Sequence, residues 1–325
     1  MIRRREAIAG IGCAMALPAV ARAQEAERVR RVGLLLPTSF GPFYQTGAAA
    51  LRQELAQLGW IEGRNLRIDD YPGPLEQIDD RAAELVRSAP DVIIVWGIAA
   101  TRAVQQRTRI IPIVFLSVGD AMASGIVNNV ARPEGNATGF TNFFASFGGK
   151  WVELLKEVAP QTSRIAVVWN PNYNFNLSYA NRASIETAAK AMAIEPVSIA
   201  VRSPAEIAQA IPAFAAQPNG ALLFSPTPAF QILVYKLAVE YNLPSIGSGR
   251  DDAANGALLS YGSNRANLFR EGAKYVDRIL RGAKVGDLPV QFPTRFELIV
   301  NLKTAKALGL TVPNTILVSA DEVIE

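Results

Sequence analysis

The chain has 325 residues, 50% hydrophobic and 19% charged, which is ordinary for a globular protein and long enough for two domains. It contains no histidine, which excludes Ser-His-Asp and Cys-His catalytic arrangements and removes the usual ligand of zinc, copper and non-haem iron. The formal net charge is +4, but the first 23 residues hold four of 33 basic and one of 29 acidic residues, so 29 and 28 remain and no basic block argues for nucleic-acid binding.

Residues 1–23 have the pattern of a cleaved export signal. Three arginines precede an apolar run from Ala7 to Val20, and Ala21-Arg22-Ala23 supplies small residues at which cleavage is expected. The run is shorter than the ~20 residues that cross a bilayer. Arg4-Arg5 fits a twin-arginine signal, whereas the basic start equally fits a Sec signal. We therefore expect a periplasmic protein exported by one of these two routes.

A first series of strands and helices follows the leader. Continuous apolar runs, typical of parallel strands covered on both faces, predict strands at 31–36, 65–71, 91–96, 112–117 and 137–141. Between the first two, Leu51, Leu55 and Leu58 share one helical face that stops at Gly59.

A second series repeats the pattern, with strands predicted at 164–169, 195–200, 220–225, 243–248 and 257–262. Ser203 to Glu206 forms a capping box that starts a helix, which Pro212 is expected to kink or end. Tyr275 to Leu280 lies in another helical stripe. The tail predicts one more strand at 296–302 and a short helix at 304–308.

The two series imply two lobes of similar size. The spacing from first to fourth strand is 81 residues in the first series and 80 in the second. We therefore expect an α/β fold of two doubly wound, Rossmann-like lobes joined by a multi-stranded hinge. Lobe 1 would comprise 29–143 and about 262–290, and lobe 2 would comprise 144–261 and about 291–325.

Two stretches resemble known binding motifs but lack residues that those motifs require. The stretch "DDAANG" at 251–256 has Ala253 where a calcium loop needs its third ligand, so a polar turn before a strand is the preferred interpretation. Asp251 and Asp252, as adjacent acids in a strand, would point to opposite faces. The stretch "GGK" at 148–150 lacks the earlier glycine of a phosphate loop. We predict no catalytic residues, no metal and no cofactor.

Candidate site residues lie at the strand ends, because ligands of open α/β sheets bind beyond the carboxyl ends of the strands. They are Ser39, Phe40, Phe43, Trp96, Gly97, Thr101, Ser117, Asp120, Asn142, Asn170, Tyr173, Asn174, Phe224, Ser225, Thr227, Ser248 and Tyr261. Rings, hydroxyls and amides with one acid describe a pocket that holds a small, partly apolar molecule without transforming it. Taken singly, Trp96 and Phe224 also fit a core, and Asn170-Pro171 fits a turn.

Several longer segments resemble a known family. The chain is similar to the periplasmic substrate-binding proteins of ABC transporters, within the group whose characterised members bind aromatic amino acids such as tryptophan, phenylalanine and tyrosine. The resemblance covers essentially the whole chain. It is carried by "PIVF…GD" (112–120), "ARPEGNATG" (131–139), "RIAVVWNPN" (164–172), "LLSYG" (258–262), "FELIVNLKTAKALGL" (296–310) and the terminal "ADEVIE".

The resemblance implies a type I periplasmic-binding-protein fold, hinge closure on the ligand and delivery to an inner-membrane permease. For an amino-acid ligand, we expect the carboxylate near Ser39 and Thr101, and the ammonium at Asp120. Where many members have Asp-Pro-Val after the fourth strand, this chain has Asp120-Ala121-Met122, which leaves the ligand identity open.

Alternatives remain at this point. The same fold could serve as a sensing domain for a receptor or sensor kinase, and an exported hydrolase or isomerase could use carboxylates. An aromatic acid, a branched amino acid or a small amide fits the residues nearly as well as an aromatic amino acid. We expect a monomer, as the default for a carrier that docks on a permease.

Overall fold

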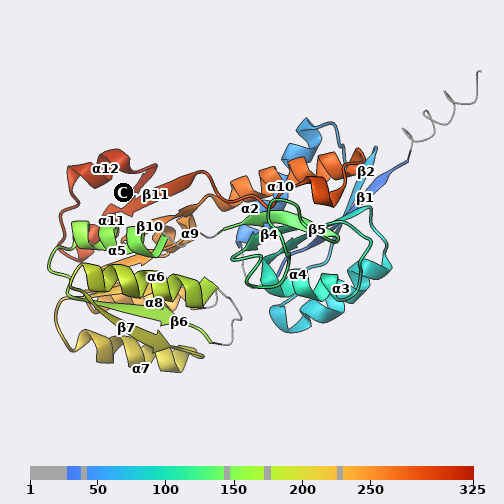
Figure 1. The fold of residues 1–325 in the computed structure, drawn as a ribbon. Helices are drawn as coiled ribbons and strands as arrows, with labels where there is room; N and C mark the ends of the chain where they lie inside the picture. Colours follow the sequence, from blue (N-terminus) through green and yellow to red (C-terminus); the bar gives the residue numbers. More distant parts are fainter. Residues whose placement is uncertain (1–27, 38–41, 143–146, 172–176, 225–229) are drawn as a thin grey trace, which may run out of the picture.

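The computed structural model describes residues 28–37, 42–142, 147–171, 177–224 and 230–325. These residues form two α/β lobes, each with helices on both faces of a mainly parallel sheet (Figure 1). The predicted export signal lies outside the described residues. The predicted fold class, two doubly wound lobes, is confirmed.

Lobe 1 contains a parallel sheet of order β2-β1-β3-β4-β5. Its strands are β1 (Arg30–Leu35), β2 (Leu66–Asp70), β3 (Val92–Trp96), β4 (Ile113–Val118) and β5 (Ala137–Thr141). Its helices are α2 (Pro42–Gln57), η2 (Leu75–Gln77), α3 (Ile78–Arg87), α4 (Gly97–Gln105), α10 (Arg265–Leu280) and η3 (Val285–Asp287).

The central strands of lobe 1 are apolar because both faces of the sheet are covered. Helices α2 and α10 pack together on one face, with Leu51, Leu55 and Phe269 in the shared core. Helices α3 and α4 cover the other face. Every side chain of β3 and β4 is consequently buried, which stabilises the sheet mainly through removal of apolar area from water.

Lobe 2 contains a sheet of order β12-β11-β10-β9-β8-β6-β7, in which β10 and β11 are antiparallel. Its strands are β6 (Arg164–Trp169), β7 (Glu195–Ala200), β8 (Gly220–Phe224), β9 (Ser245–Gly247), β10 (Leu259–Ser263), β11 (Phe296–Asn301) and β12 (Glu322–Ile324). Its helices are α5 (Phe147–Val158), α6 (Leu177–Ala191), α7 (Pro204–Ala215), α8 (Gln231–Glu240), α9 (Arg250–Ala254), α11 (Leu302–Ala307) and α12 (Asn314–Ser319).

Lobe 2 buries two apolar layers. Trp151, Leu155 and Ile185 lie in the layer formed with α5 and α6, which also includes residues of α11 and α12. Ile207 and Val234 lie in the layer under α7 and α8 on the opposite face.

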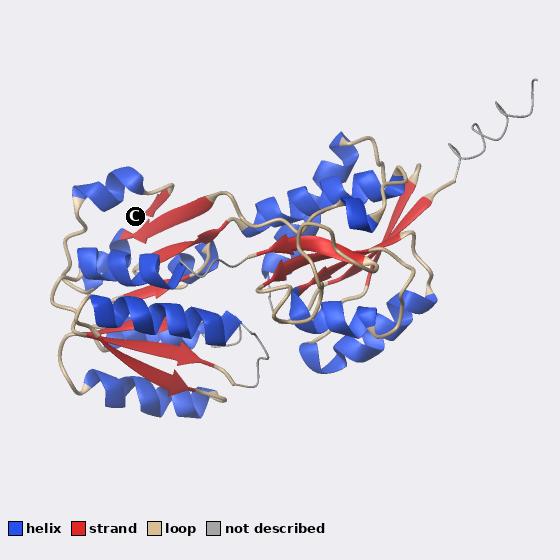
Figure 2. Cartoon of the chain, in the orientation of Figure 1, coloured by secondary structure: helices blue, strands red, loops and turns tan. Residues whose placement is uncertain are grey.

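The chain passes between the lobes in three places. It passes from β5 to α5, from β10 to α10, and from Gln291 to β11. The third passage is anchored in lobe 1, because the Gln291 carbonyl accepts a hydrogen bond from the Thr141 N–H at 2.9 Å. Figure 2 shows the second and third of these connections running between the two sheets.

The eleven predicted strands all occur, with ends within two residues of those expected. Two details differ. Helix α7 begins as predicted, with Ser203 accepting the Glu206 N–H, but it continues past Pro212 to Ala215, so the proline does not end it. Residues Asp251 and Asp252 lie in α9 and not in a polar turn or strand, which is a correction to the interpretation of "DDAANG".

Candidate functional site

The strand ends of the two sheets face one another across the junction of the lobes. Figure 1 shows the arrows of β6 and β7 pointing toward lobe 1. Parallel strands bring their carboxyl ends to one edge, so this junction is where the topology collects the predicted site residues.

In lobe 1, the predicted site residues at the end of β3 and in the first turns of α4 are buried. The Trp96 ring is 5% exposed and stacks on Phe269, with centroids 5.1 Å apart. Gly97 begins α4 with a φ of +81°, a conformation that favours glycine. The buried Thr101 hydroxyl donates to the Gly97 carbonyl at 2.7 Å. Thr101 therefore stabilises the first turn of α4, and its expected contact with a ligand carboxylate stays a prediction.

The structure brings Ser117 and Asn142 together. Asn142 donates from its amide nitrogen to the Ser117 hydroxyl at 2.7 Å, although 25 residues separate them. Ser117 has a φ of +56°, an uncommon backbone conformation for a residue other than glycine. The Asn142 carbonyl oxygen is buried without a hydrogen-bond partner among the described residues, so it retains acceptor capacity at the junction.

Asp120 is exposed and has a local role. Its Oδ1 accepts the N–H groups of Met122 at 3.0 Å and Ala123 at 2.9 Å. The carboxylate therefore caps the turn that follows β4. Its expected contact with a ligand ammonium stays a prediction.

In lobe 2, Asn170 is buried and Tyr261 is half-buried. The Tyr261 ring packs against Phe147 and Phe296, with centroids 5.9 Å from each. Its carbonyl accepts the Trp151 indole N–H at 2.7 Å. Tyr261 thus belongs to an aromatic cluster beside the hinge.

The remaining predicted residues are only partly described. The backbone places Phe43 in the first turn of α2 and Phe224 at the end of β8. Six predicted residues lie outside the described residues, namely Ser39, Phe40, Tyr173, Asn174, Ser225 and Thr227.

Ser248 follows β9 and is held by a buried carboxylate that the sequence did not single out for a role. Asp252 is 0% exposed, and its Oδ2 accepts the N–H groups of Ser248 and Gly249 at 2.9 Å each. Its Oδ1 accepts the Tyr235 hydroxyl at 2.8 Å and the Gln231 side-chain amide. Burial, and then the charge of Asp252, raise the pKa of the Tyr235 phenol, which therefore remains a donor.

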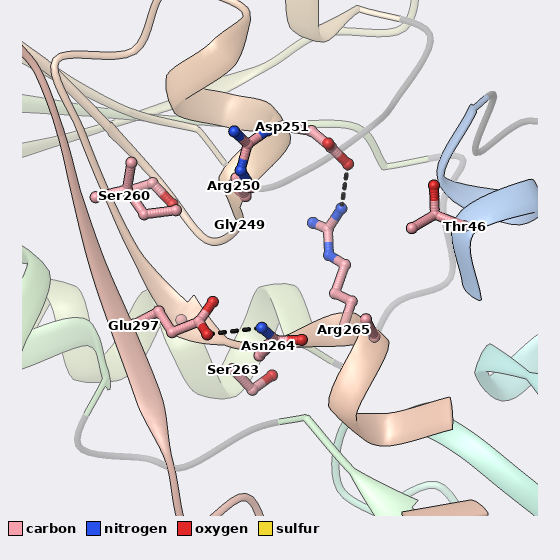
Figure 3. Close-up of a pocket in the computed structure, with 12 residues that line it drawn as sticks. Thr46, Gly249, Arg250, Asp251, Ser260, Ser263, Asn264, Arg265 and Glu297 are labelled. Atoms are coloured by element: carbon pink, nitrogen blue, oxygen red, sulfur yellow. Dashed lines mark hydrogen bonds and ion pairs between the residues drawn. The ribbon is translucent and has the colours of Figure 1, made fainter. Parts of the chain in front are cut away.

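A cavity of about 230 Å³ lies beside this loop at the hinge (Figure 3). We call it the hinge pocket. Its lining comes from both lobes: Thr46, Gly249, Arg250, Asp251, Ser260, Gly262, Ser263, Asn264, Arg265, Ala266, Glu297 and Ile299. None of these residues was predicted to bind a ligand, because no sequence motif connects α9, β10 and β11.

The hinge pocket contains charges of both signs. The Arg265 guanidinium lies 3.3 Å from an oxygen of Asp251, and Asn264 donates to Glu297 at 2.6 Å. Arg250 is engaged by both oxygens of Glu322, at 2.8 and 2.6 Å.

Among the described ranges, no group of three or more His, Cys, Asp and Glu side chains is placed to hold a metal ion. Across the same part of the chain, no helix combines the length and hydrophobicity that crossing a membrane requires.

Comparison with known proteins gives a consistent result. The family model for ABC transporter substrate binding proteins matches residues 46–324. A tyrosine-binding protein of Clostridioides difficile (strain R20291) is 27% identical over 264 residues, which cover 79% of this chain and 74% of that protein.

Solved structures share the fold. A domain from Streptococcus pneumonia in complex with L-Trp has a TM-score of 0.83 at 21% identity, covering 91% of this chain and 99% of that one. The ligand-free, open structure of a Clostridium difficile substrate-binding protein has a TM-score of 0.71 at 24% identity, with 91% and 99% covered. The type I periplasmic-binding-protein fold is therefore confirmed. The chain belongs to the family of ABC transporter substrate binding proteins, which bind solutes and are not enzymes.

Proposed function

We propose that this protein captures an amino acid with an aromatic side chain between its two lobes and delivers it to an ABC permease in the inner membrane. The observation that carries the proposal is the junction of the lobes, where opposed strand ends and a pocket with both charge signs meet. The related tyrosine-binding protein and the L-Trp-bound structural neighbour support an aromatic amino acid as the ligand.

Location and assembly follow from the same proposal. The protein would be exported by the signal at residues 1–23 and act in the periplasm as a monomer. Size-exclusion chromatography with light scattering checks the monomer. Mass spectrometry of the protein recovered from the periplasm checks cleavage after Ala23.

Native mass spectrometry of residues 24–325, before and after ligand stripping, tests capture. A retained mass equal to that of an aromatic amino acid is the expected result. Titration calorimetry of the stripped protein with L-tyrosine, L-tryptophan and L-phenylalanine should then give saturable binding. The proposal would be refuted if the protein bound none of the three amino acids but did bind a compound without charged groups.

Delivery needs a separate measurement. The loaded protein should raise the ATPase rate of its permease in proteoliposomes above the rate with the empty protein. Stimulation of a sensor kinase or chemoreceptor, with no effect on any permease, would instead support the sensing function.

A further inference from the structure

The hinge pocket has the charge pattern of a site for a zwitterion. Its lining contains two guanidinium groups, Arg250 and Arg265, and two carboxylates, Asp251 and Glu297. Arg250 is already held by a bidentate contact with Glu322. Arg265 lines the cavity as well and lies 3.3 Å from Asp251, so positive and negative groups are neighbours in its lining. A ligand with one charge of each sign complements this arrangement better than an anion, a cation or a sugar.

A buried hydroxyl without a hydrogen-bond partner among the described residues also lies in the lining of this cavity. Ser260 lies on β10 and lines the pocket, and its hydroxyl oxygen is buried, at 1% residue exposure, without a hydrogen-bond partner among the described residues. Buried hydroxyls are usually paired, so an unpaired one beside a cavity indicates a missing partner. A ligand donor or acceptor would supply it.

The size of the cavity suits part of a ligand. At about 230 Å³ it is smaller than the roughly 300–1,000 Å³ typical of sites that enclose whole ligands. A charged head group fits such a space, with the side chain extending toward the rest of the junction.

We infer that the hinge pocket binds the charged head group of an α-amino acid. Arg265 binds the carboxylate, Glu297 binds the ammonium, and the Ser260 hydroxyl contributes a further hydrogen bond. This inference rests on the proposed capture of an amino acid and assigns its recognition to residues of α10, β10 and β11. Five N–H donors let one guanidinium serve both Asp251 and a ligand carboxylate.

The position of the pocket links recognition to the hinge. Arg265 begins α10, which packs in lobe 1, whereas Ser260 and Glu297 lie on strands of lobe 2. Figure 3 shows Arg265 reaching toward Asp251 of α9, with Thr46 of α2 on its other side. A head group bound to Arg265 and Glu297 therefore contacts both lobes at the hinge.

Titration calorimetry with matched ligands tests the assignment. The wild-type chain, Arg265→Gln and Glu297→Gln are titrated with L-tyrosine and L-tryptophan. They are also titrated with the corresponding amides, which lack the carboxylate, and with 3-(4-hydroxyphenyl)propionate and indole-3-propionate, which lack the ammonium. Arg270→Gln is the control, because Arg270 is an exposed arginine on the same helix and its loss changes net charge equally.

Arg265→Gln should weaken the two amino acids about 10- to 100-fold, because a hydrogen-bonded contact to a charged group is lost, and should change amide affinity by less than about threefold. Glu297→Gln should weaken the amino acids similarly and spare the deaminated acids. Arg270→Gln should match the wild type. If Arg265→Gln does not fold, Arg265→Lys keeps the charge without the planar fork and should give a smaller loss.

Three outcomes would overturn the inference. Amino-acid affinity in Arg265→Gln and Glu297→Gln within twofold of the wild type would refute it while leaving amino-acid capture intact. A selective loss in Asp120→Asn with Glu297→Gln unchanged would move the ammonium to Asp120 and refute the role of Glu297. A folded wild-type protein that binds neither amino acid would refute both this inference and the proposed function.

Discussion

Replacing Asp252 by asparagine should strongly destabilise lobe 2. The buried carboxylate accepts four hydrogen bonds, two at each oxygen. An asparagine amide has only one acceptor oxygen, and its NH₂ group must face the donors on the other side. With its NH₂ group toward Gln231 and Tyr235, those two side chains must reorient to accept, and with its NH₂ group toward Ser248 and Gly249 it faces two backbone donors. In either orientation two charge-assisted hydrogen bonds are lost.

The magnitude follows from these contacts. A hydrogen bond to a charged group contributes roughly 1.5–3 kcal/mol, so two lost bonds cost about 3–6 kcal/mol of the free energy of unfolding. Domains of this kind are stable by roughly 5–15 kcal/mol, so the loss is a large fraction of the total. Tyr235→Phe removes one of the four bonds and should cost about 1.5–3 kcal/mol.

Urea unfolding at 25 °C, followed by tryptophan fluorescence and by circular dichroism, measures these differences. Trp151 and Trp169 report on lobe 2, and Trp60 and Trp96 on lobe 1, so single-tryptophan versions separate the two transitions. Asp251→Asn is the matched control. Its side chain is 45% exposed and makes a single contact with Arg265, so its loss should cost less than about 1 kcal/mol.

The reasoning fails if Asp252→Asn is as stable as Asp251→Asn. It also fails if the destabilisation appears only in the lobe 1 transition, because all four donors to Asp252 belong to lobe 2.

Three further predictions concern stability. Trp96→Ala, measured by urea unfolding without ligand, should lose about 3–5 kcal/mol, because the buried ring stacks on Phe269; unchanged stability would contradict its core position. Gly262→Ala should lose about 1–3 kcal/mol, since a Cβ there would lie 1.9 Å from the Ser248 carbonyl oxygen; wild-type melting behaviour would rule out this contact. The folded-state pKa of Tyr235 is above its unfolded value of about 10, so its contribution to stability is complete below pH 10 and declines as pH rises further. The stability difference between wild type and Tyr235→Phe should therefore shrink between pH 10 and 11, and a constant difference would refute the raised pKa.

Much of the fold could be predicted because its signals are local. Continuous apolar runs such as residues 91–96 and 112–117 are the pattern of strands covered on both faces, and both became buried central strands. Pro212 was misleading because tertiary packing outweighed a local signal. A proline removes one backbone N–H from the helix, yet α7 continues to Ala215 with Ile207, Ile211 and Phe214 buried in the core of lobe 2.

The site was less predictable because hydrogen-bond partners come from distant segments. The sequence did not indicate that the Oδ1 atom of Asp120 caps its own turn, or that the Thr101 hydroxyl donates to the Gly97 carbonyl. The expected ligand contacts of both residues stay predictions. A usable signal did exist for the Asp252 network. Gln231 and Tyr235 are four residues apart on one face of α8, and both are buried, which places both polar groups toward the same partner.

The two repeated series of strands and helices and the family could be predicted from the amino-acid pattern, because periodicity and short segments are properties of the local sequence. Which polar groups meet depends on tertiary packing, because Arg265, Glu297 and Ser260 are on three different elements. Their proximity is a result of α10 packing in lobe 1 while β10 and β11 pair in lobe 2, and no local pattern encodes that packing.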